Sequence, residues 1–440
     1  MESKVAPAAA PSLPRLLSGL GLWMLVINGI VGAGIFGLAG EAARLAGGLS
    51  PWLFLACAAL MLPVMLSFAE LSSHYDASGG PVRYTSAVYG PVAGFLTGWA
   101  LYIGRLTAFA ANAVVLVGAV GYFWPDADAP GVRLALLFGV CAALTGVTVA
   151  GTRNAMGSLA VLTLLKFLPL VGLVAWGLVR LPGEMLSGLV PARPDISNAG
   201  AALLLVFYAY VGFESGLVPA GEARDPRRHL PRALAWSIAL VAVLYTALQL
   251  VSLAVLPGLA QAHRPLVEVA AAVAGPAGAA LMMAGMVASI GGNLSGSLFS
   301  APRITHALAA EGRLPAAFGR VSRRFGTPAF SIVAFGAAAF ALAAAGTFAW
   351  LAGLSVVART LIYLACVSTI PAVRRRRGAP VEVLRLPGGH AIPLLAAAVC
   401  LGLLSQVKLV DWLATGAMFG VGALLFLLAT RGRAQPGRPT

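Results

Sequence analysis

Two ionisable side chains stand inside long apolar stretches of the sequence and could do chemistry that depends on charge. Lys166 lies in the run 164–169, and Glu214 follows the aromatic segment 207–210. An ionisable group at membrane depth is costly, and it is a functional hypothesis by default. Because desolvation disfavours a charged amine, Lys166 could gain and lose a proton; alternatively, it is a fixed charge that caps carbonyl oxygens of a broken helix. Glu214 is either a functional acid or the partner of a buried arginine.

Three further polar side chains lie in apolar stretches. Arg105 and Arg359 cannot easily lose protons, so we expect both to face the interior and to pair with carboxylates or carbonyl oxygens. Direct contact with a ligand is the other interpretation of the two arginines. Asn293 is either a pocket residue or one partner of an interhelical hydrogen bond. The excess of positive charge in this set weighs against a dicationic ligand.

Two apolar segments carry features that interrupt a helix. Residues 29–37 contain four glycines, which favour either a break or a close helix contact, and residues 207–215 combine a glycine, aromatic rings and a carboxylate. In a membrane, non-helical backbone survives only where it is buried in protein or lines a cavity. A break in the first segment exposes N–H groups that suit a carboxylate, and one in the second exposes carbonyls that suit an ammonium group. The pair therefore suits the zwitterionic head that α-amino acids share.

The composition indicates which class of protein holds these groups in position. Of 440 residues, 59% are apolar and only 10% are charged, and mean hydropathy is +0.89. A soluble domain carries roughly 25% charged residues, so soluble, disordered and disulfide-rich classes fit poorly. The composition is typical of a polytopic helical membrane protein.

A membrane span needs about 20 mostly apolar residues. The sequence predicts twelve such spans, at residues 17–38, 50–72, 91–121, 133–150, 155–180, 199–219, 233–257, 275–300, 328–346, 348–371, 391–408 and 411–430. We expect an all-α fold with twelve transmembrane helices.

The basic residues predict the orientation of these spans. With the N-terminus inside, 21 of the 30 Lys and Arg residues fall on the cytoplasmic side, six fall outside and three lie within spans. This bias follows the positive-inside rule and places both termini in the cytoplasm. It also accounts for the net charge of +15 without an anionic partner, so we expect no nucleic acid.

The two interrupted segments are five spans apart, so the two groups of five spans have opposite orientations. Such segments at corresponding positions indicate an inverted-repeat transporter with a midplane site. The predicted organisation is a tail (1–16), a first repeat (17–180), a second repeat (199–371), two further helices (391–430) and a tail (431–440).

No other chemistry stands out. The four cysteines lie in apolar runs without paired spacing and read as buried apolar residues, not as a disulfide framework or metal site. No phosphate-binding loop, zinc-protease motif or nucleophile elbow is present, so we expect no cofactor, no metal and no enzyme activity. A sensor, a partner subunit and a channel are the remaining alternatives.

The chain resembles amino acid permeases of the amino acid–polyamine–organocation superfamily over almost its whole length. The strings that carry this resemblance are VGAGIFG, FYAYVGFES, GEARDPRRHLPRAL, APRITHALAAEGRLPAAFGRVSRRFGTP, YLACVSTIPAVRRRR and LRLPGG. The resemblance implies a leucine-transporter-like fold, with a 5+5 inverted repeat and broken helices 1 and 6, and secondary transport of amino acids.

The resemblance also implies roles for individual positions. Lys166 falls where sodium-independent relatives replace a sodium ion, and Glu214 matches a glutamate linked to proton dependence. Asn293 departs from arginine/agmatine exchangers, which carry a tryptophan there. The implied contacts to the substrate carboxylate are Val31, Gly32, Ala33, Gly34 and Ile35, and those to the amino group are Tyr208, Ala209, Tyr210 and Gly212, with Tyr208 as a gating aromatic.

Together these features predict a proton-coupled carrier for neutral amino acids in a bacterial inner membrane. The alternative is an exchanger of amino acids or amines, including cationic ones. The expected partners are an amino acid, protons and the lipid bilayer, and a homodimer is left open.

Overall fold

The apolar stretches form helices because a segment in hydrocarbon pairs its backbone polar groups internally in that way. The computed structural model describes residues 18–75, 80–151, 158–180, 198–217, 225–375 and 384–431. Within these ranges all regular structure is helical. Every predicted span overlaps at least one helix.

The helices follow one another in the predicted order. The first five segments are α1 (Gly19–Ile30) with α2 (Gly34–Ala46), α3 (Ser50–Ser73), α5 (Pro91–Val120), α6 (Pro130–Ala150) and α7 (Ser158–Arg180). The next five are α9 (Ala199–Phe207) with α10 (Glu214–Leu217), α11 (Pro226–Val255), α12 (Pro265–Ala310), α14 (Ala329–Ala345) and α15 (Phe348–Val367). The last two are α17 (Ala391–Leu404) and α18 (Leu409–Arg431), and α4 (Gly80–Tyr89), α13 (Ala316–Gly319) and α16 (Ile370–Arg375) are short connecting helices.

Length and composition make this a multi-span membrane protein. In the described part of the chain, eight helical segments are long and apolar enough to cross a bilayer, and three shorter apolar helices accompany them. The exact number of spans stays a prediction.

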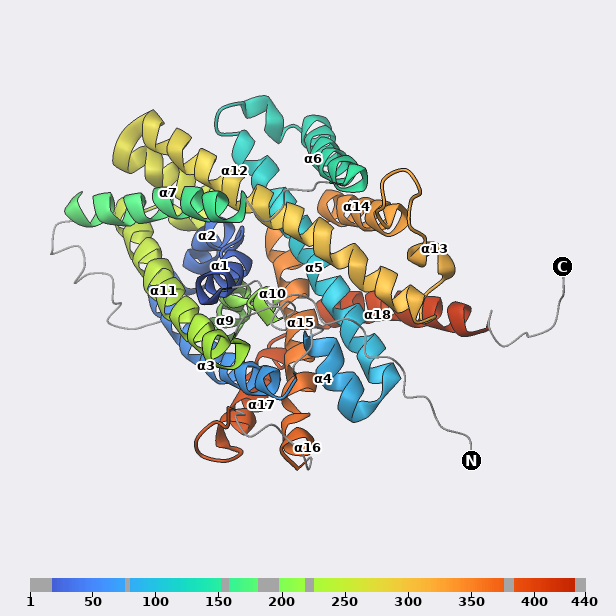
Figure 1. Ribbon diagram of the computed structural model, residues 1–440. Helices are drawn as coiled ribbons and strands as arrows, with labels where there is room; N and C mark the ends of the chain where they lie inside the picture. The colour runs from blue at the N-terminus through green and yellow to red at the C-terminus, as the bar shows by residue number, and fades with distance from the viewer. Residues whose placement is uncertain are drawn as a thin grey trace, which may run out of the picture.

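The broken helices occupy the centre of the bundle. Figure 1 shows α1, α2, α9 and α10 in the middle, surrounded by α3, α5, α7, α11, α12 and α15, with α6, α14 and α18 farther out. In the most apolar windows of α5 and α15, 72% of the residues are buried, against 11% in α6 and α18. The outer helices therefore present their apolar side chains to lipid, and the inner ones build the core.

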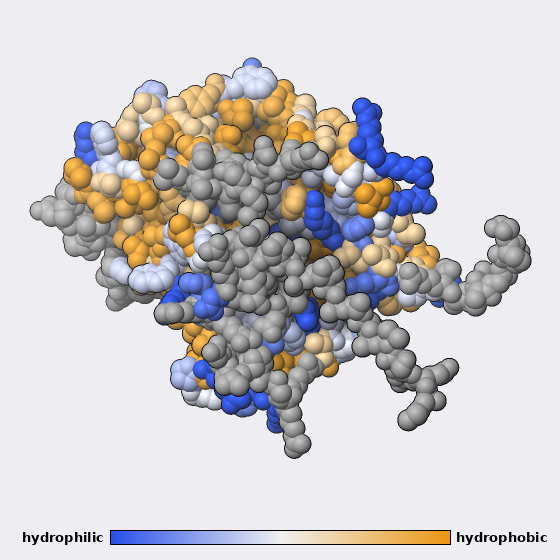
Figure 2. All heavy atoms as spheres, in the orientation of Figure 1, coloured by the Kyte–Doolittle hydropathy of each residue, from blue (hydrophilic) through white to orange (hydrophobic). Residues whose placement is uncertain are grey.

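Helix α7 has one face exposed at the apolar surface and one face buried in the protein core. The outward side chains of α7 include Leu168, Val171 and Val179, which are more than half exposed, whereas Lys166 on the same helix is fully buried. Figure 2 shows apolar side chains over the upper part of the visible face, where α7 and α12 lie in Figure 1. The cation in the middle of this apolar helix, unlike Arg180 at its end, thus points into the protein.

The segment predicted as span 275–300 is longer than the sequence indicated. Helix α12 bends at Ala274 and Gly275, where Gly275 has a φ of 64°, and it continues to Ala310. Residues 301–310, predicted as a connection, stay helical because Ala301, Thr305 and Leu308 bury one face at helical spacing.

The prediction for the cysteines can be checked in the described residues, whereas those for the tails and for several basic residues cannot. All four cysteines are free and buried, as predicted. The predicted tails, 1–16 and 431–440 apart from Arg431, lie outside the described residues, as do several basic residues used for the orientation, among them Arg153, Arg193, Arg376 and Arg377.

Candidate functional site between two helix breaks

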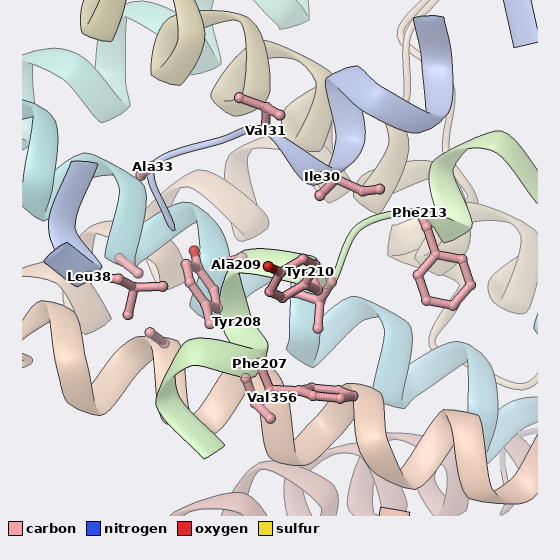
Figure 3. Packing of buried hydrophobic residues seen from close by; sticks show 14 of the residues in the cluster. Ile30, Val31, Ala33, Leu38, Phe207, Tyr208, Ala209, Tyr210, Phe213 and Val356 are labelled. Atoms are coloured by element: carbon pink, nitrogen blue, oxygen red, sulfur yellow. The ribbon is translucent and has the colours of Figure 1, made fainter. Parts of the chain in front are cut away.

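The first apolar segment is a broken helix. Helix α1 ends at Ile30, Val31 has an extended backbone with ψ 90°, and α2 begins at Gly34. Figure 3 shows the irregular stretch between Val31 and Ala33, with the Tyr208 ring below it. The break predicted from the glycines is therefore present.

The second interrupted segment breaks in a different way. After α9 the chain forms one 3₁₀ turn, Tyr208–Tyr210, and becomes extended at Val211 with ψ 161°. Gly212 has a φ of 106°, a conformation that residues with a side chain rarely adopt. Helix α10 then begins at Glu214.

The two breaks touch each other through glycine. A Cβ added to Gly29 would lie 2.3 Å from the carbonyl oxygen of Gly212, and one added to Gly212 would lie 2.2 Å from the carbonyl oxygen of Gly29. Both interpretations of the glycine-rich string therefore hold. Gly29 permits close packing, and residues 31–33 form the break.

A small cavity of about 30 Å³ lies between the breaks. The space is narrow, and it is not fully enclosed. The cavity walls are formed by Gly29, Ile30, Gly32, Ala33, Gly34, Ala108, Asn112, Tyr208, Val211, Asn293 and Arg359.

Helix α2 directs free N–H groups toward this cavity. The Gly32 N–H before this helix donates to the Ile30 oxygen at 3.0 Å, and the first N–H of α2 that finds a backbone acceptor is that of Gly37, which donates to the Ala33 oxygen at 3.1 Å. Among the described residues, the N–H groups of 33–36 have no acceptor. Ala33 and Gly34 also line the cavity. A carboxylate placed there would meet unpaired donors and the positive end of the helix dipole.

A polar network crosses the cavity from three helical segments. The Tyr208 hydroxyl donates to Asn112 Oδ1 at 3.0 Å, and Asn112 Nδ2 donates to Asn293 Oδ1 at 2.8 Å. Asn293 thus serves both predicted roles, as a pocket residue and as an interhelical partner. Asn112 was missed at the sequence level, although a lone amide in an apolar span was a usable signal. The Tyr208 ring also packs edge-on against Phe348, with centroids 6.0 Å apart.

Lys166 closes the end of α1 from the outside of the cavity. Its ammonium donates to the Asn28 carbonyl at 3.3 Å, to Asn28 Oδ1 at 2.5 Å and to the Val31 carbonyl at 2.8 Å. The Ser289 hydroxyl donates to the same Val31 oxygen at 3.4 Å. Three acceptors match the three donors of a charged amine. In this conformation Lys166 caps the carbonyls of a broken helix, as one of the two interpretations states.

Glu214 is held inside the protein by three donors. The Gly212 N–H and the Tyr363 hydroxyl donate to Oε2 at 3.0 and 3.1 Å, and Arg359 forms an ion pair with Oε1. Glu214 is 1% exposed, and Arg359 is 7% exposed. The predicted pairing of Arg359 with a carboxylate is confirmed, and Arg359 also lines the cavity.

The prediction for Arg105 is wrong in its partner. Arg105 donates to the Ser300 hydroxyl at 2.7 Å, and among the described residues its Nε has no hydrogen-bond partner. Glu214, the acid that the sequence analysis places inside a span, is already paired with Arg359 and is therefore not available to Arg105.

Five other predicted site residues lie beside the cavity and do not line it. The Val31 carbonyl binds Lys166, and the Tyr210 hydroxyl donates to the Phe54 carbonyl at 2.7 Å. Ala209 packs against Gly34. Ile35 is fully buried in the core, and Gly212 serves the contact between the breaks.

A second ion pair, with a buried carboxylate and a partly exposed arginine, lies apart from this site. Arg374 binds Glu70 at the end of α3 through two contacts of 2.6 and 2.7 Å, and it donates to the Gly389 carbonyl at 2.6 Å. This pair ties α3 to α16 and to the loop before α17.

These features define the class of protein: a helical membrane protein whose small polar cavity lies between two discontinuous helices, as in secondary transporters. The family profile described as "Amino acid permease" matches residues 17–431. The chain belongs to this family, within the amino acid–polyamine–organocation superfamily. The family implies a leucine-transporter-like fold, and it is a family of transporters, not of enzymes.

Named relatives are distant but match along most of their length. The methylthioribose transporter of Bacillus subtilis is 27% identical, covering 98% of this chain and 96% of the relative. The branched-chain amino acid permease BcaP of the same organism is 24% identical, with 93% coverage of both chains. Its serine/threonine exchanger SteT is 26% identical, covering 90% of this chain and 92% of the relative.

Proposed function

We propose that this protein is a proton-coupled secondary transporter of neutral amino acids that works by alternating access. The observation that carries the proposal is the cavity between the breaks, with unpaired N–H groups of α2 on one wall and a polar network on another. Such a cavity suits a substrate with a carboxylate and a second polar group.

The proposed binding mode divides the substrate between the two breaks. The carboxylate binds the unpaired N–H groups of Ala33 and Gly34, next to Gly32 in the cavity wall, and the ammonium group binds the backbone around Val211. Tyr208 lies over the site and closes it. The neighbouring residues Val31, Ile35, Ala209, Tyr210 and Gly212 shape the breaks that present these groups.

Lys166 supplies the proposed proton coupling. With α1 in the observed position, three oxygen acceptors stabilise the charged amine. Movement of α1 during transport removes these acceptors and leaves a buried cation without partners, which favours loss of its proton. Protonation of Lys166 and the position of α1 are thereby linked. Glu214, the second residue proposed for proton coupling, accepts from three donors and holds the second break in place in this conformation.

Exchange without net proton movement is the second candidate. The complete set of acceptors around Lys166 favours it, because a lysine that keeps these contacts throughout the cycle is a fixed charge. The relative named as a serine/threonine exchanger supports the same alternative, whereas the one named as a branched-chain amino acid permease supports uptake.

We further propose twelve membrane spans in a bacterial inner membrane, with both termini in the cytoplasm. Spans 17–180 and 199–371 form the two inverted repeats, and 391–430 adds two helices. The support is the distribution of Lys and Arg along the chain and the family's fold.

The experiment uses purified protein in vesicles loaded with buffer. With an inward proton gradient, labelled neutral amino acid should accumulate above equilibrium, and a protonophore should abolish the accumulation. Uptake that ignores the gradient and requires unlabelled amino acid inside the vesicles would replace the proposal with exchange. A sealed vesicle containing a heat-inactivated sample serves as the control.

A further inference from the structure

Two asparagine side chains meet across the cavity, one from α5 and one from α12. Asn112 is 2% exposed, and its amide nitrogen donates to Asn293 Oδ1 at 2.8 Å. The Tyr208 hydroxyl donates to the oxygen of Asn112 at 3.0 Å. The proposed contacts to the carboxylate and the amine use the breaks and leave this amide pair without an assigned role.

The amide pair has unused hydrogen-bonding capacity that faces the cavity. A carboxamide offers two N–H donors and an oxygen that accepts two bonds. Among the described residues, Asn293 Nδ2 donates no hydrogen bond, and it lies 3.1 Å from the position that a Cβ of Gly32 would occupy. Free donors therefore stand beside the first break, next to the place proposed for the substrate's head group.

We infer that Asn112 and Asn293 select the side chain of the substrate, which is a short neutral chain ending in a hydroxyl or amide, as in serine, threonine or asparagine. The inference rests on the proposed function and narrows its substrate class. A polar side chain of this size can share the amide hydrogen bonds that already cross the cavity.

The size of the cavity and the charges around it favour the same class of substrate, with a short neutral side chain. The cavity of about 30 Å³ has to expand for any amino acid, and a short side chain requires the least expansion. Arg359 lines the same cavity, but its ion pair with Glu214 leaves no carboxylate free to bind a cationic side chain there. An anionic side chain would compete with Glu214, which already pairs with Arg359.

An apolar side chain of similar size fits this cavity less well. It either separates the two amides or covers the free N–H groups of Asn293 without offering an acceptor. Sites built to bond a hydroxyl reject analogues that lack it, because their own polar groups are left unpaired. The two amides keep part of their bonding to each other, so we expect a preference of about tenfold or more for threonine over valine.

The test measures equilibrium binding of glycine, serine, threonine, asparagine, valine and leucine to the purified full-length protein. Wild-type protein should bind threonine about tenfold or more tightly than valine, which has nearly the same shape. Asn112→Leu keeps the volume but removes the amide, so its ratio of threonine to valine affinity should fall to about one. Asn198→Leu, at the exposed start of α9, is the control and should keep the wild-type ratio.

Two results would overturn the inference while leaving amino acid transport in place. One is a wild-type protein that binds valine as tightly as threonine, and the other is an Asn112→Leu protein with an unchanged ratio. If Asn112→Leu does not fold, Asn293→Leu replaces it, because Asn293 is less buried. The threonine-to-valine affinity ratios of that variant and of the wild-type protein then decide the inference. A wild-type protein that binds none of the six amino acids would overturn the proposed function as well.

Discussion

The two helix breaks are each held by a cation, but the two cations differ in kind. At the first break, Lys166 of α7 binds the carbonyl oxygens at the end of α1 directly. At the second, Arg359 of α15 binds Glu214, whose other oxygen accepts the Gly212 N–H. Helices α7 and α15 are the fifth and tenth predicted spans, so the two cations occupy corresponding places in the predicted repeats.

This difference suggests a division of labour between the breaks. A lysine shifts its protonation readily when buried, whereas an arginine stays charged. In the proposed mechanism the first break therefore responds to protons, whereas the second is held by a charge pair. In the same mechanism the close contact between Gly29 and Gly212 links movement of one break to the other.

Removing the cation of the second break should have the largest effect on stability. Arg359→Ala leaves the Glu214 carboxylate buried without its partner, at a cost of about 3–5 kcal/mol. The thermal midpoint in detergent should fall sharply, and Glu214→Gln in the same protein should restore part of it. Arg44→Ala is the control, since the Arg44–Glu41 pair is 56% and 30% exposed and such pairs contribute about 0–1 kcal/mol.

Disturbing the contact between the two breaks should have the next largest effect on stability. Gly212→Ala adds a Cβ at a φ of 106°, 2.2 Å from the Gly29 oxygen, so strain and overpacking together should cost about 2–4 kcal/mol. The midpoint of thermal unfolding measures this cost. In Gly353→Ala the new methyl group meets no atom within 4 Å, and an unchanged or raised midpoint is expected there. Equal losses in both variants would contradict the proposed contact.

Filling the first break should act on binding more than on stability. A Cβ at Gly34 lies 3.2 Å from the Ala209 Cα and 3.5 Å from the Tyr208 ring, so Gly34→Leu should occupy the cavity. Substrate affinity should drop about a hundredfold or more, while the protein still inserts into the membrane and elutes as folded material. Normal affinity would place the site elsewhere in the chain.

The smallest effect concerns a single hydroxyl. Tyr208→Phe removes the donor that orients the Asn112 amide in the cavity wall, so affinity should fall by about fivefold or less, equivalent to about 1 kcal/mol. Tyr210→Phe removes a similar bond to the Phe54 carbonyl outside the cavity. It should lower the unfolding midpoint slightly and leave affinity as it was. Isothermal titration of both variants separates the two results.

Much of the fold followed from the sequence because the bilayer restricts the choices. Long apolar runs have to be helices, and the breaks at 29–37 and 207–215 carried visible glycines. The boundaries of α12 were harder to predict, because Ala301, Thr305 and Leu308 bury a face that is only weakly apolar.

The site itself was only partly predictable. Lys166, Glu214 and Arg359 stood out because charge is rare in this chain, yet their partners depend on packing between helices far apart in sequence. Asn112 meets Asn293 across 181 positions, and Arg105 bonds a serine hydroxyl that no pattern marked. Spacing along one helix does not reveal which side chain of another helix lies opposite.

The most direct test of the account is gradient-driven accumulation by Lys166 variants in vesicles. Lys166→Arg keeps a cation that does not lose its proton, and Lys166→Ala removes the cation altogether. We predict that the arginine variant still exchanges internal for external amino acid but no longer accumulates it when a proton gradient is imposed, and that the alanine variant also loses pH-dependent accumulation. Accumulation at the wild-type level in either variant would contradict the role of Lys166 in proton coupling.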